Sequence, residues 1–370
     1  MKQIILILSL ILTLNLSAQQ TLESIQIDGN NRQYYKYLPT GFDSNTESVP
    51  LVIFLHGLGG NALQLTSIGY NQIGDTARFI TVYLEGTLNS NGQNSWNNGT
   101  LLGTNVNDVL FISKVIDEIK VEHNIDLSRV YLTGISMGSI MTYKAIRHLD
   151  DRIAAVSCHI GTMSTEEISG YSPNNPVPVQ HIHGTADGTV PYDGTALPSL
   201  SLVPQTIDKL KTINGWNGDS TITNIPDSKA DGITIEKIVY NTTTPLELWK
   251  MNGGDHIYLF PSVNDTAGVF VSWYWFNQFT HPNPVTASVN ELENNNQKIE
   301  FYPNPASGKL FIKKFHTLKG VRIYNMNGQA VFNEIISDEF LDISSIKTGI
   351  YIIEFTVLNG TITKNKLIIE

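Results

Sequence analysis

The chain has 370 residues, of which 41% are hydrophobic and 16% are charged, a composition typical of a globular protein with a sizeable core. Its 34 acidic and 24 basic residues give a formal net charge of −10, and the lysines and arginines form no cluster. Charge and composition therefore argue against nucleic acid as a partner.

Residues 1–18 have the pattern of a secretory signal peptide. A lysine precedes the apolar run IILILSLILTLNL, and SAQQ follows it, which predicts cleavage after Ala18. A buried N-terminal helix is the alternative interpretation. The run is too short for a stable membrane anchor, so no transmembrane anchor is expected after signal removal. Export implies an oxidising compartment, yet Cys158 is the only cysteine, which excludes an intramolecular disulfide.

From residue 19 to residue 281, short apolar runs alternate with amphipathic stretches, which predicts a mainly parallel sheet flanked by helices. Residues 24–29 and 32–39 predict an opening hairpin. Six later runs predict core strands: LVIFLHG, FITVYLEG, RVYLTGIS, IAAVSCHIG, VPVQHIHG and PLELWKMNGG. Apolar spacing in DVLFISKVIDEIKVEH predicts a crossover helix, and VNDTAGVFVSWYWFNQF predicts a closing helix, with a strand as the alternative.

Three later segments differ in composition from this pattern. Residues 194–245 are rich in Pro, Gly, Asn, Asp and Thr, which predicts an irregular insertion able to cover a pocket, with one helix near SLVPQTIDKLKTI. The Asn-rich residues 282–298 predict a linker. Residues 299–370 contain strand-like runs, two pairs of them joined through Asn-Gly, which predicts a small all-β sandwich of about seven strands.

The stretch VYLTGISMGSIMTYKAI places Ser136 between a predicted strand and a predicted helix. A serine at a helix start can act as an N-cap. It can also be a nucleophile on a sharp strand-to-helix turn, where Gly134 and Gly138 are needed because little room is left for Cβ atoms. In that case the backbone N–H of Met137 would point at the oxyanion that forms when the serine attacks an acyl group.

Three further strand ends favour the nucleophile. LHGLGGN predicts a flexible loop whose Leu58 N–H is the second oxyanion donor, with His56 orienting the loop rather than acting as the base. Asp187 in HGTADGTVP and His256 in GGDHIY follow two later strands, so the chain order is Ser, Asp, His. His256 would take the Ser136 proton and return it to the leaving alcohol, while Asp187 holds the imidazole.

These residues also have alternatives. Asp187 could stabilise a turn, because Asp-Gly is common turn chemistry, and Asp255 and Asp193 are rival acids for the histidine. His181 and His183 could project from one face of a strand toward a metal. No second pair with ligand spacing accompanies them, so neither a metal nor a cofactor is expected.

Three aromatic residues are candidates for binding substrate. Trp96, Tyr192 and Trp216 fall on loops near predicted strand ends, where they could stack on a sugar or on an aromatic acyl group. Each could instead pack within its own loop.

The combination of LHGLGGN, DLSRVYLTGISMGSIMTY, HGTADGTVPY and GGDHIY resembles the secreted esterases known as polyhydroxybutyrate depolymerase-like, feruloyl or acetylxylan esterases. The resemblance implies an α/β-hydrolase fold with the same triad and oxyanion hole. YPNPASGKLFIK, VRIYNMNGQAV and ISSIKTGIYIIEF resemble the sorting domain of the Bacteroidetes type IX secretion system. This second resemblance implies export through the periplasm to the medium or the outer cell surface. A carbohydrate-binding module is the alternative for this tail, although it would normally show a row of exposed aromatics.

The sequence thus predicts an α/β-hydrolase domain followed by a small all-β sandwich, acting as a secreted serine carboxylic-ester hydrolase. The expected substrates are feruloyl or acetyl esters of plant polysaccharides, and the expected partner of the tail is the type IX machinery. A polyester depolymerase is the first alternative. A serine peptidase and a non-catalytic surface binding protein that keeps the hydrolase scaffold are the others.

Overall fold

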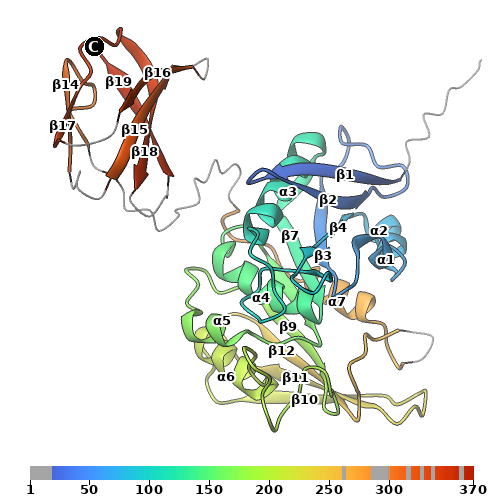
Figure 1. Ribbon diagram of the computed structural model, residues 1–370. Coiled ribbons are helices and arrows are strands. Elements are labelled where there is room, and N and C mark those ends of the chain that lie inside the picture. Colours follow the sequence, from blue (N-terminus) through green and yellow to red (C-terminus); the bar gives the residue numbers. More distant parts are fainter. Residues whose placement is uncertain are drawn as a thin grey trace, which may run out of the picture. The chain divides into compact units, whose positions relative to one another are not determined.

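The protein is described here by a computed structural model that covers residues 19–260, 264–284, 299, 301–313, 318–325, 329–334, 338–357 and 362–370. The chain divides into two compact units between Thr286 and Ala287 (Figure 1). The predicted signal peptide and most of the predicted linker lie outside the described residues. Among the helices of the described residues, none combines the length and the apolar character that a membrane span requires.

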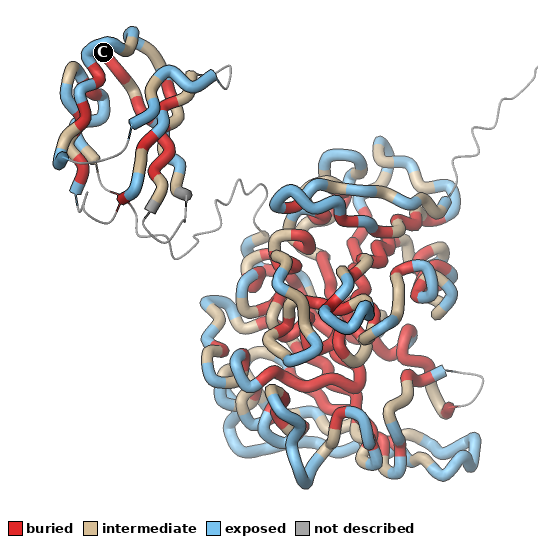
Figure 2. Tube along the Cα trace, viewed as in Figure 1, coloured by how far each residue is buried: buried red, intermediate tan, exposed pale blue. Residues whose placement is uncertain are grey.

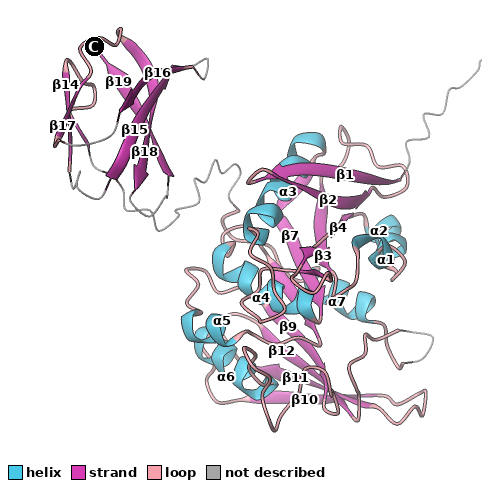
Figure 3. Cartoon of the chain, viewed as in Figure 1, coloured by secondary structure: helices cyan, strands magenta, loops and turns pink. Residues whose placement is uncertain are grey.

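The first unit is built on one ten-stranded sheet (Figure 3). Its strands are β1 Gln20–Ile27, β2 Asn30–Tyr37, β3 Val49–Leu55, β4 Ile80–Leu84, β7 Ile125–Ile135, β8 Ala155–His159, β9 Val179–Gly184, β10 Ser220–Ile225, β11 Thr234–Tyr240 and β12 Leu246–Asn252. Their spatial order is β1-β2-β4-β3-β7-β8-β9-β12-β11-β10. The strands from β4 to β12 in this order are parallel, and an antiparallel hairpin extends the sheet at either edge.

Successive residues of a strand point to opposite faces of the sheet, and strands such as β3 and β4 are apolar at nearly every position. Both faces therefore need cover, and helices lie on both. The helices are α1 Ala62–Leu65, α2 Tyr70–Ala77, α3 Asp108–Glu122, α4 Met137–His148, α5 Thr165–Gly170, α6 Val203–Ile213 and α7 Gly268–Phe276. Leu51, Ile53 and Leu55 of β3 pack into the core formed with α3, α4 and α6. Val52 and Phe54 pack on the opposite side with α1, α2 and α7. The central strands β3, β4, β8 and β9 are therefore buried on both faces, whereas the edge strand β10 is largely exposed and the edge strand β1 is partly exposed (Figure 2).

The predicted strands and helices of this unit are present, including the opening hairpin, the crossover helix α3 and the closing helix α7. A short ribbon of β5 Thr87–Leu88 and β6 Asn94–Ser95 lies outside the main sheet. Because β3, β7, β9 and β12 run in the same direction, their carboxyl ends meet at one edge of the sheet. The loops that carry the candidate catalytic residues leave from those ends.

Residues 194–245 differ from the predicted irregular insertion. The expected helix forms as α6, but β10 and β11 add two antiparallel strands to the sheet beside β12. Their sequences, STITNI and TIEKIVY, are rich in β-branched residues, which fit a pleated surface. The composition of the whole segment concealed them, because its Pro, Gly and Asp residues are concentrated in the connecting turns.

The second unit is a small all-β sandwich, as predicted. Its seven described strands are β13 Phe301–Tyr302, β14 Lys309–Ile312, β15 Leu318–Asn325, β16 Ala330–Glu334, β17 Phe340–Asp342, β18 Gly349–Val357 and β19 Ile362–Ile369. They form a three-stranded sheet, β13-β14-β17, and a four-stranded sheet, β16-β15-β18-β19, whose buried residues share one core. The two hairpins predicted from Asn-Gly are antiparallel pairs, and their turns lie outside the described residues.

Candidate active site

Ser136 occupies a sharp turn between β7 and α4. Its φ of 54° and ψ of −116° lie where residues with a side chain are rarely found. A Cβ on Gly134 would lie 2.3 Å from the carbonyl carbon of Gly138, and one on Gly138 would lie 2.2 Å from the carbonyl oxygen of Leu55. Only glycine fits at both positions. Ser136 sits at the N-cap position, but its side chain makes no capping hydrogen bond to α4, so its hydroxyl is available for other contacts.

The structure brings Ser136, His256 and Asp187 into one line of hydrogen bonds. The Ser136 Oγ lies 2.9 Å from His256 Nε2, and His256 Nδ1 lies 2.7 Å from Asp187 Oδ2. Because the carboxylate can only accept, Nδ1 carries the imidazole proton and Nε2 accepts from the serine hydroxyl. The three side chains follow the ends of β7, β12 and β9, three strands whose carboxyl ends share one edge.

The Asp187 carboxylate is buried and fully hydrogen-bonded. Its Oδ1 accepts from the backbone N–H groups of Thr189 at 2.8 Å and Val190 at 2.7 Å. Its Oδ2 accepts from His256 and lies 3.1 Å from His183 Nε2. Burial by itself raises the pKa of Asp187, but these hydrogen bonds and the nearby His256 outweigh burial and lower the pKa well below its ordinary value. The carboxylate is therefore ionised at neutral pH.

The two rival acids have other surroundings. The Asp255 Oδ1 accepts from the backbone N–H groups of His256 at 2.7 Å and Gly188 at 3.3 Å, which ties two loops together. Asp193 lies exposed on the loop after β9. Of the three candidate acids, Asp187 is the one that the structure places against the imidazole.

The loop after β3 adjoins the serine. A Cβ on Gly57 would lie 3.4 Å from the Ser136 Cβ, so the loop begins in van der Waals contact with this side chain. Asn94 holds the loop in place: its side-chain Nδ2 donates to the Gly60 carbonyl at 3.1 Å, and its own carbonyl accepts from the Gly59 N–H at 2.8 Å. Sequence reasoning missed Asn94, which carries no motif of its own.

The backbone N–H groups of Leu58, in the loop that contacts Ser136 through Gly57, and of Met137, the residue after Ser136, have no hydrogen-bond acceptor within the described part of the chain. Met137 is the first residue of α4, where the helix dipole is positive and favours an anion. The buried Asn98 fixes Met137 from the other side, since its Nδ2 lies 2.6 Å from the Met137 Sδ and 3.3 Å from its carbonyl oxygen. Asn98 was missed, and only the polar run NSWNNG could have pointed to it.

His56 lies buried beneath the same loop. Its Nε2 accepts from the Gly86 N–H at 2.9 Å, so Nδ1 carries the proton and donates to the Gly57 carbonyl at 2.7 Å. Burial lowers the pKa of His56 to about 4, and the imidazole is neutral at pH 7. Both ring nitrogens are occupied by the backbone, an arrangement that supports the loop and leaves neither nitrogen for proton transfer.

The free energy of unfolding is expected to fall between pH 6.5 and about 4, in part because of His56. In this window the unfolded histidine binds a proton and the folded one does not, so acidification favours the unfolded state, by up to about 3 kcal/mol. Urea unfolding at pH 7, 6 and 5 measures the effect. The variant His56→Gln should lose less stability than the wild type relative to its own value at pH 7, and equal losses would contradict the assignment.

Trp96 is fully buried, which corrects its assignment to substrate stacking. Its Nε1 donates to the His56 carbonyl at 2.8 Å, and its ring centroid lies 4.9 Å from that of the His56 ring. It thus packs its own loop, the alternative that the sequence left open. Tyr192 is half-buried on the loop after β9, with its ring edge-on to His183 at 6.1 Å. Of the three aromatic candidates, Tyr192 is the one that contacts a neighbour of the triad, since His183 lies 3.1 Å from Asp187 Oδ2.

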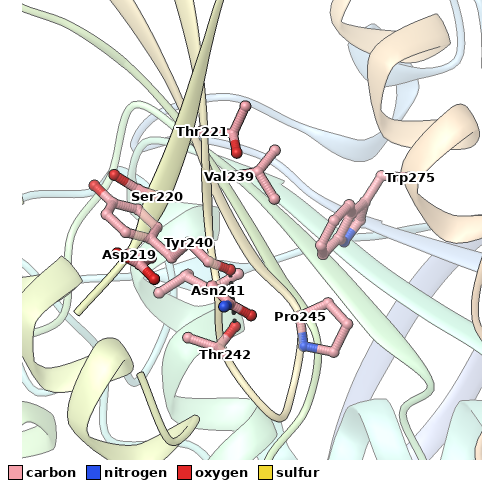
Figure 4. Close-up of a pocket in the computed structure, with 10 residues that line it drawn as sticks. Asp219, Ser220, Thr221, Val239, Tyr240, Asn241, Thr242, Pro245 and Trp275 are labelled. Carbon is pink, nitrogen blue, oxygen red and sulfur yellow. Dashed lines mark hydrogen bonds between the residues drawn. The ribbon is translucent and has the colours of Figure 1, made fainter. Parts of the chain in front are cut away.

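Trp216 lies near the strand ends opposite those that carry the triad. Its candidate role in stacking on substrate is therefore also corrected. Its ring is edge-on to Tyr240, which ends β11 and pairs with Leu246 at the start of β12. His256 follows the opposite end of β12, and a strand of seven residues is about 20 Å long. A cleft near these opposite strand ends is lined by residues that include Ser220, Thr221, Tyr240, Asn241 and Pro245 (Figure 4).

Replacing Trp96 by alanine is expected to lower the free energy of unfolding by about 3–5 kcal/mol, because it removes a buried ring and the donor to the His56 carbonyl. Trp216→Ala is the matched control, since this side chain is 40% exposed. Its effect should stay below about 1 kcal/mol. Urea unfolding measures both, and similar losses in the two variants would show that Trp96 is not packed as described.

One group of three acidic side chains in the described residues is close enough to share a cation: Asp227, Asp231 and Asp265. Asp227 and Asp231 lie between β10 and β11, and Asp265 lies on the segment that follows the triad histidine. The Asp265 carboxylate already accepts from the backbone N–H groups of Ser228 at 2.6 Å and Lys229 at 2.9 Å. These hydrogen bonds join the two loops, which accounts for the closeness of the three carboxylates.

Two segments of the chain match known families. Residues 32–177 match the family described as Esterase PHB depolymerase, and residues 300–370 match the Secretion system C-terminal sorting domain. The resemblance read from the motifs is thus confirmed for both segments. The second match points to secretion or to the cell surface through the type IX system.

The similar proteins include esterases. A bifunctional acetylxylan esterase/xylanase of Neocallimastix patriciarum is 29% identical over 71% of this chain and 35% of its own length. Feruloyl esterase B of Piromyces equi is 32% identical over 42% of this chain and 29% of its own length. The chain thus spans about a third of the length of each. The structure of an acetyl xylan esterase from Aspergillus awamori, 17% identical, matches 70% of this chain and 99% of that one with a TM-score of 0.51. The α/β-hydrolase fold is thereby confirmed.

Proposed function

We propose that the protein is a secreted serine carboxylic-ester hydrolase. The observation that carries this proposal is the hydrogen-bonded line from Ser136 through His256 to Asp187, set on a strand-to-helix turn beside two unoccupied backbone N–H groups. A hydroxyl is a weak nucleophile at neutral pH, and a neutral imidazole held by a carboxylate is the arrangement that activates it. The geometry suits acyl transfer.

Each residue has a role in the proposed reaction. As the Ser136 Oγ bonds to the acyl carbon, His256 Nε2 takes its proton, and the carbonyl oxygen becomes an oxyanion that the Leu58 and Met137 N–H groups bind. The ester C–O bond then breaks, and the alcohol leaves with the proton from His256. A water molecule attacks the acyl-serine, His256 takes and returns a proton again, and the acid is released. Asp187 stabilises the imidazolium in both steps.

Feruloyl and acetyl esters of plant polysaccharides are the proposed substrates. The relatives named as acetylxylan and feruloyl esterases support this class, and Tyr192 supplies a half-buried aromatic ring next to His183, which adjoins Asp187. The family description Esterase PHB depolymerase supports the alternative of a polyester substrate. In the proposal the C-terminal segment addresses the chain, after passage through the periplasm, to the type IX machinery.

A substrate panel tests the proposal. The protein is incubated with feruloylated xylan, acetylated xylan and polyhydroxybutyrate, and released ferulate, acetate and 3-hydroxybutyrate are measured, with p-nitrophenyl acetate as the soluble ester. Release of ferulate or acetate well above 3-hydroxybutyrate is expected. The reverse ranking would favour the polyester alternative. A folded sample that neither hydrolyses p-nitrophenyl acetate nor reacts with a fluorophosphonate would favour a binding protein instead.

A further inference from the structure

A line of buried polar side chains continues from Asp187 into the core, on the side away from His256. The His183 Nε2 lies 3.1 Å from Asp187 Oδ2, and the His181 Nε2 lies 3.2 Å from His183 Nδ1. The Tyr143 hydroxyl of α4 lies 2.6 Å from His181 Nδ1. Tyr143, His181 and His183 are each 0% exposed, and the two imidazole rings are within 10° of parallel. His181 and His183, alternate residues of β9, therefore share one face and contact each other.

The direction of the hydrogen bonds along this line follows from its end at Asp187. His183 Nε2 faces two groups that can only accept, the Asp187 carboxylate and the Val190 carbonyl at 2.8 Å, so Nε2 carries the proton. When the ring carries this single proton, His183 Nδ1 accepts and His181 Nε2 donates to it. Burial lowers the pKa of His181 well below its ordinary value, so this ring is neutral and its Nδ1 accepts from Tyr143. Every donor points toward the carboxylate.

Hydrogen-bond donors therefore reach Asp187 Oδ2 from two sides. The Asp187 Oδ2 receives N–H groups from His256 and from His183, while Oδ1 receives two backbone N–H groups. A rotation of the carboxylate breaks bonds at both oxygens. Removing the His183 donor leaves Oδ2 held only by the catalytic imidazole, which itself lies on a partly exposed loop.

We propose that Tyr143, His181 and His183 form a positioning chain, which fixes the orientation of the Asp187 carboxylate and through it the tautomer of His256. This proposal rests on the proposed esterase function. The other titratable groups around the line include Tyr192, edge-on to His183, and Asp255, bonded to the His256 backbone. His159 acts electrostatically on His181, and Cys158 and Tyr171 act on Tyr143. Burial raises the pKa of Cys158 to about 12, so this thiol is neutral.

The tautomers test the chain without reference to activity. Long-range ¹H–¹⁵N correlation spectra of the whole protein at pH 7 should show the proton on Nε2 and an accepting Nδ1 in both His181 and His183. In Tyr143→Phe the His181 Nδ1 loses its donor, so the ¹⁵N shift of this nitrogen should move toward that of a free imidazole nitrogen. A proton on Nδ1 of either histidine, or a charged ring, would overturn the proposal.

Kinetics test the positioning role. His183→Leu is expected to lower kcat for p-nitrophenyl acetate by about 10–100-fold with KM within twofold of wild type, because the carboxylate loses its fixed orientation. The acidic limb of the pH profile of kcat/KM should move to higher pH, since Asp187 with one donor fewer holds the proton on His256 more strongly. His183→Gln keeps a donor and should recover most of the loss.

Tyr143→Phe should lower kcat by about 2–10-fold. Its matched control is Tyr171→Phe, which removes a buried hydroxyl that has no hydrogen-bond partner in the described structure, and which should leave kcat and the pH profile unchanged. A folded His183→Leu with kcat within twofold of wild type and an unmoved pH profile would overturn the proposal. A wild-type protein without esterase activity would instead contradict the proposed function, and the spectra would still decide whether the chain exists.

Discussion

Replacing Ser136 by alanine is expected to lower kcat for p-nitrophenyl acetate by roughly 10⁴–10⁶-fold and to abolish labelling by a fluorophosphonate. The reason is that the Ser136 Oγ is the atom hydrogen-bonded to His256 Nε2 and held at the start of α4, and alanine offers no hydroxyl in its place. Single-turnover and steady-state assays on the purified protein measure the loss.

Ser139→Ala is the matched control for this change. Ser139 lies on the first turn of the same helix and is fully buried, but its Oγ donates to the Gly161 carbonyl at 3.2 Å and not to a triad residue. This variant should keep kcat within a few-fold of wild type and should still be labelled. If Ser136→Ala retains activity, or if Ser139→Ala alone loses it, the nucleophile has been assigned wrongly.

Asp187→Asn is expected to lower kcat by roughly 10⁴-fold, although the side chain keeps its size. Either orientation of the amide places its NH₂ against two donors: against His256 and His183 on one side, or against the backbone N–H groups of Thr189 and Val190 on the other. In the first orientation the imidazole loses the acceptor that keeps its proton on Nδ1. In the second it keeps an acceptor, but a neutral carbonyl stabilises the imidazolium less than a carboxylate does. The pH profile of kcat/KM, measured from pH 5 to 9, separates this loss from a shift in optimum.

The neighbouring acid provides the comparison for this second change. Asp255→Asn removes a charge beside the same histidine, but Asp255 accepts only from backbone N–H groups, one of which belongs to His256. A reduction of less than about 10-fold is expected. A larger loss in Asp255→Asn than in Asp187→Asn would make Asp255 the catalytic acid, the rival interpretation of the sequence.

The strands and the turn at Ser136 could be predicted because their causes are local. Residues 51–55 are uniformly apolar, which predicts a strand covered on both faces, and the close backbone contact at Gly138 shows why the turn needs glycine. Because the strands that precede Ser136, Asp187 and His256 all run in one direction, these residues are expected to meet at one edge of the sheet. Their hydrogen bonds in the structure agree with that expectation.

Features that depend on contacts between residues distant in the chain could not be predicted from the sequence. The burial of Trp96 depends on a loop that begins 40 residues earlier at His56. The position of Trp216 depends on the direction of β11, since an antiparallel strand carries its end to the edge opposite the triad. Local composition cannot decide either, because both are set by which strands pair and in which direction.

The sequence by itself determined the two-part organisation, the α/β pattern and the identity of the residues that meet at the strand ends, because periodicity, turn chemistry and motif order are properties of neighbouring residues. Only the tertiary structure decided what lies behind them. Tyr143, His181 and His183 come from α4 and β9, and they align on Asp187 because α4 packs against β7 and β8 and its Tyr143 reaches His181. A hydrogen bond needs its two groups within about 3 Å, and that distance is fixed by packing across the core.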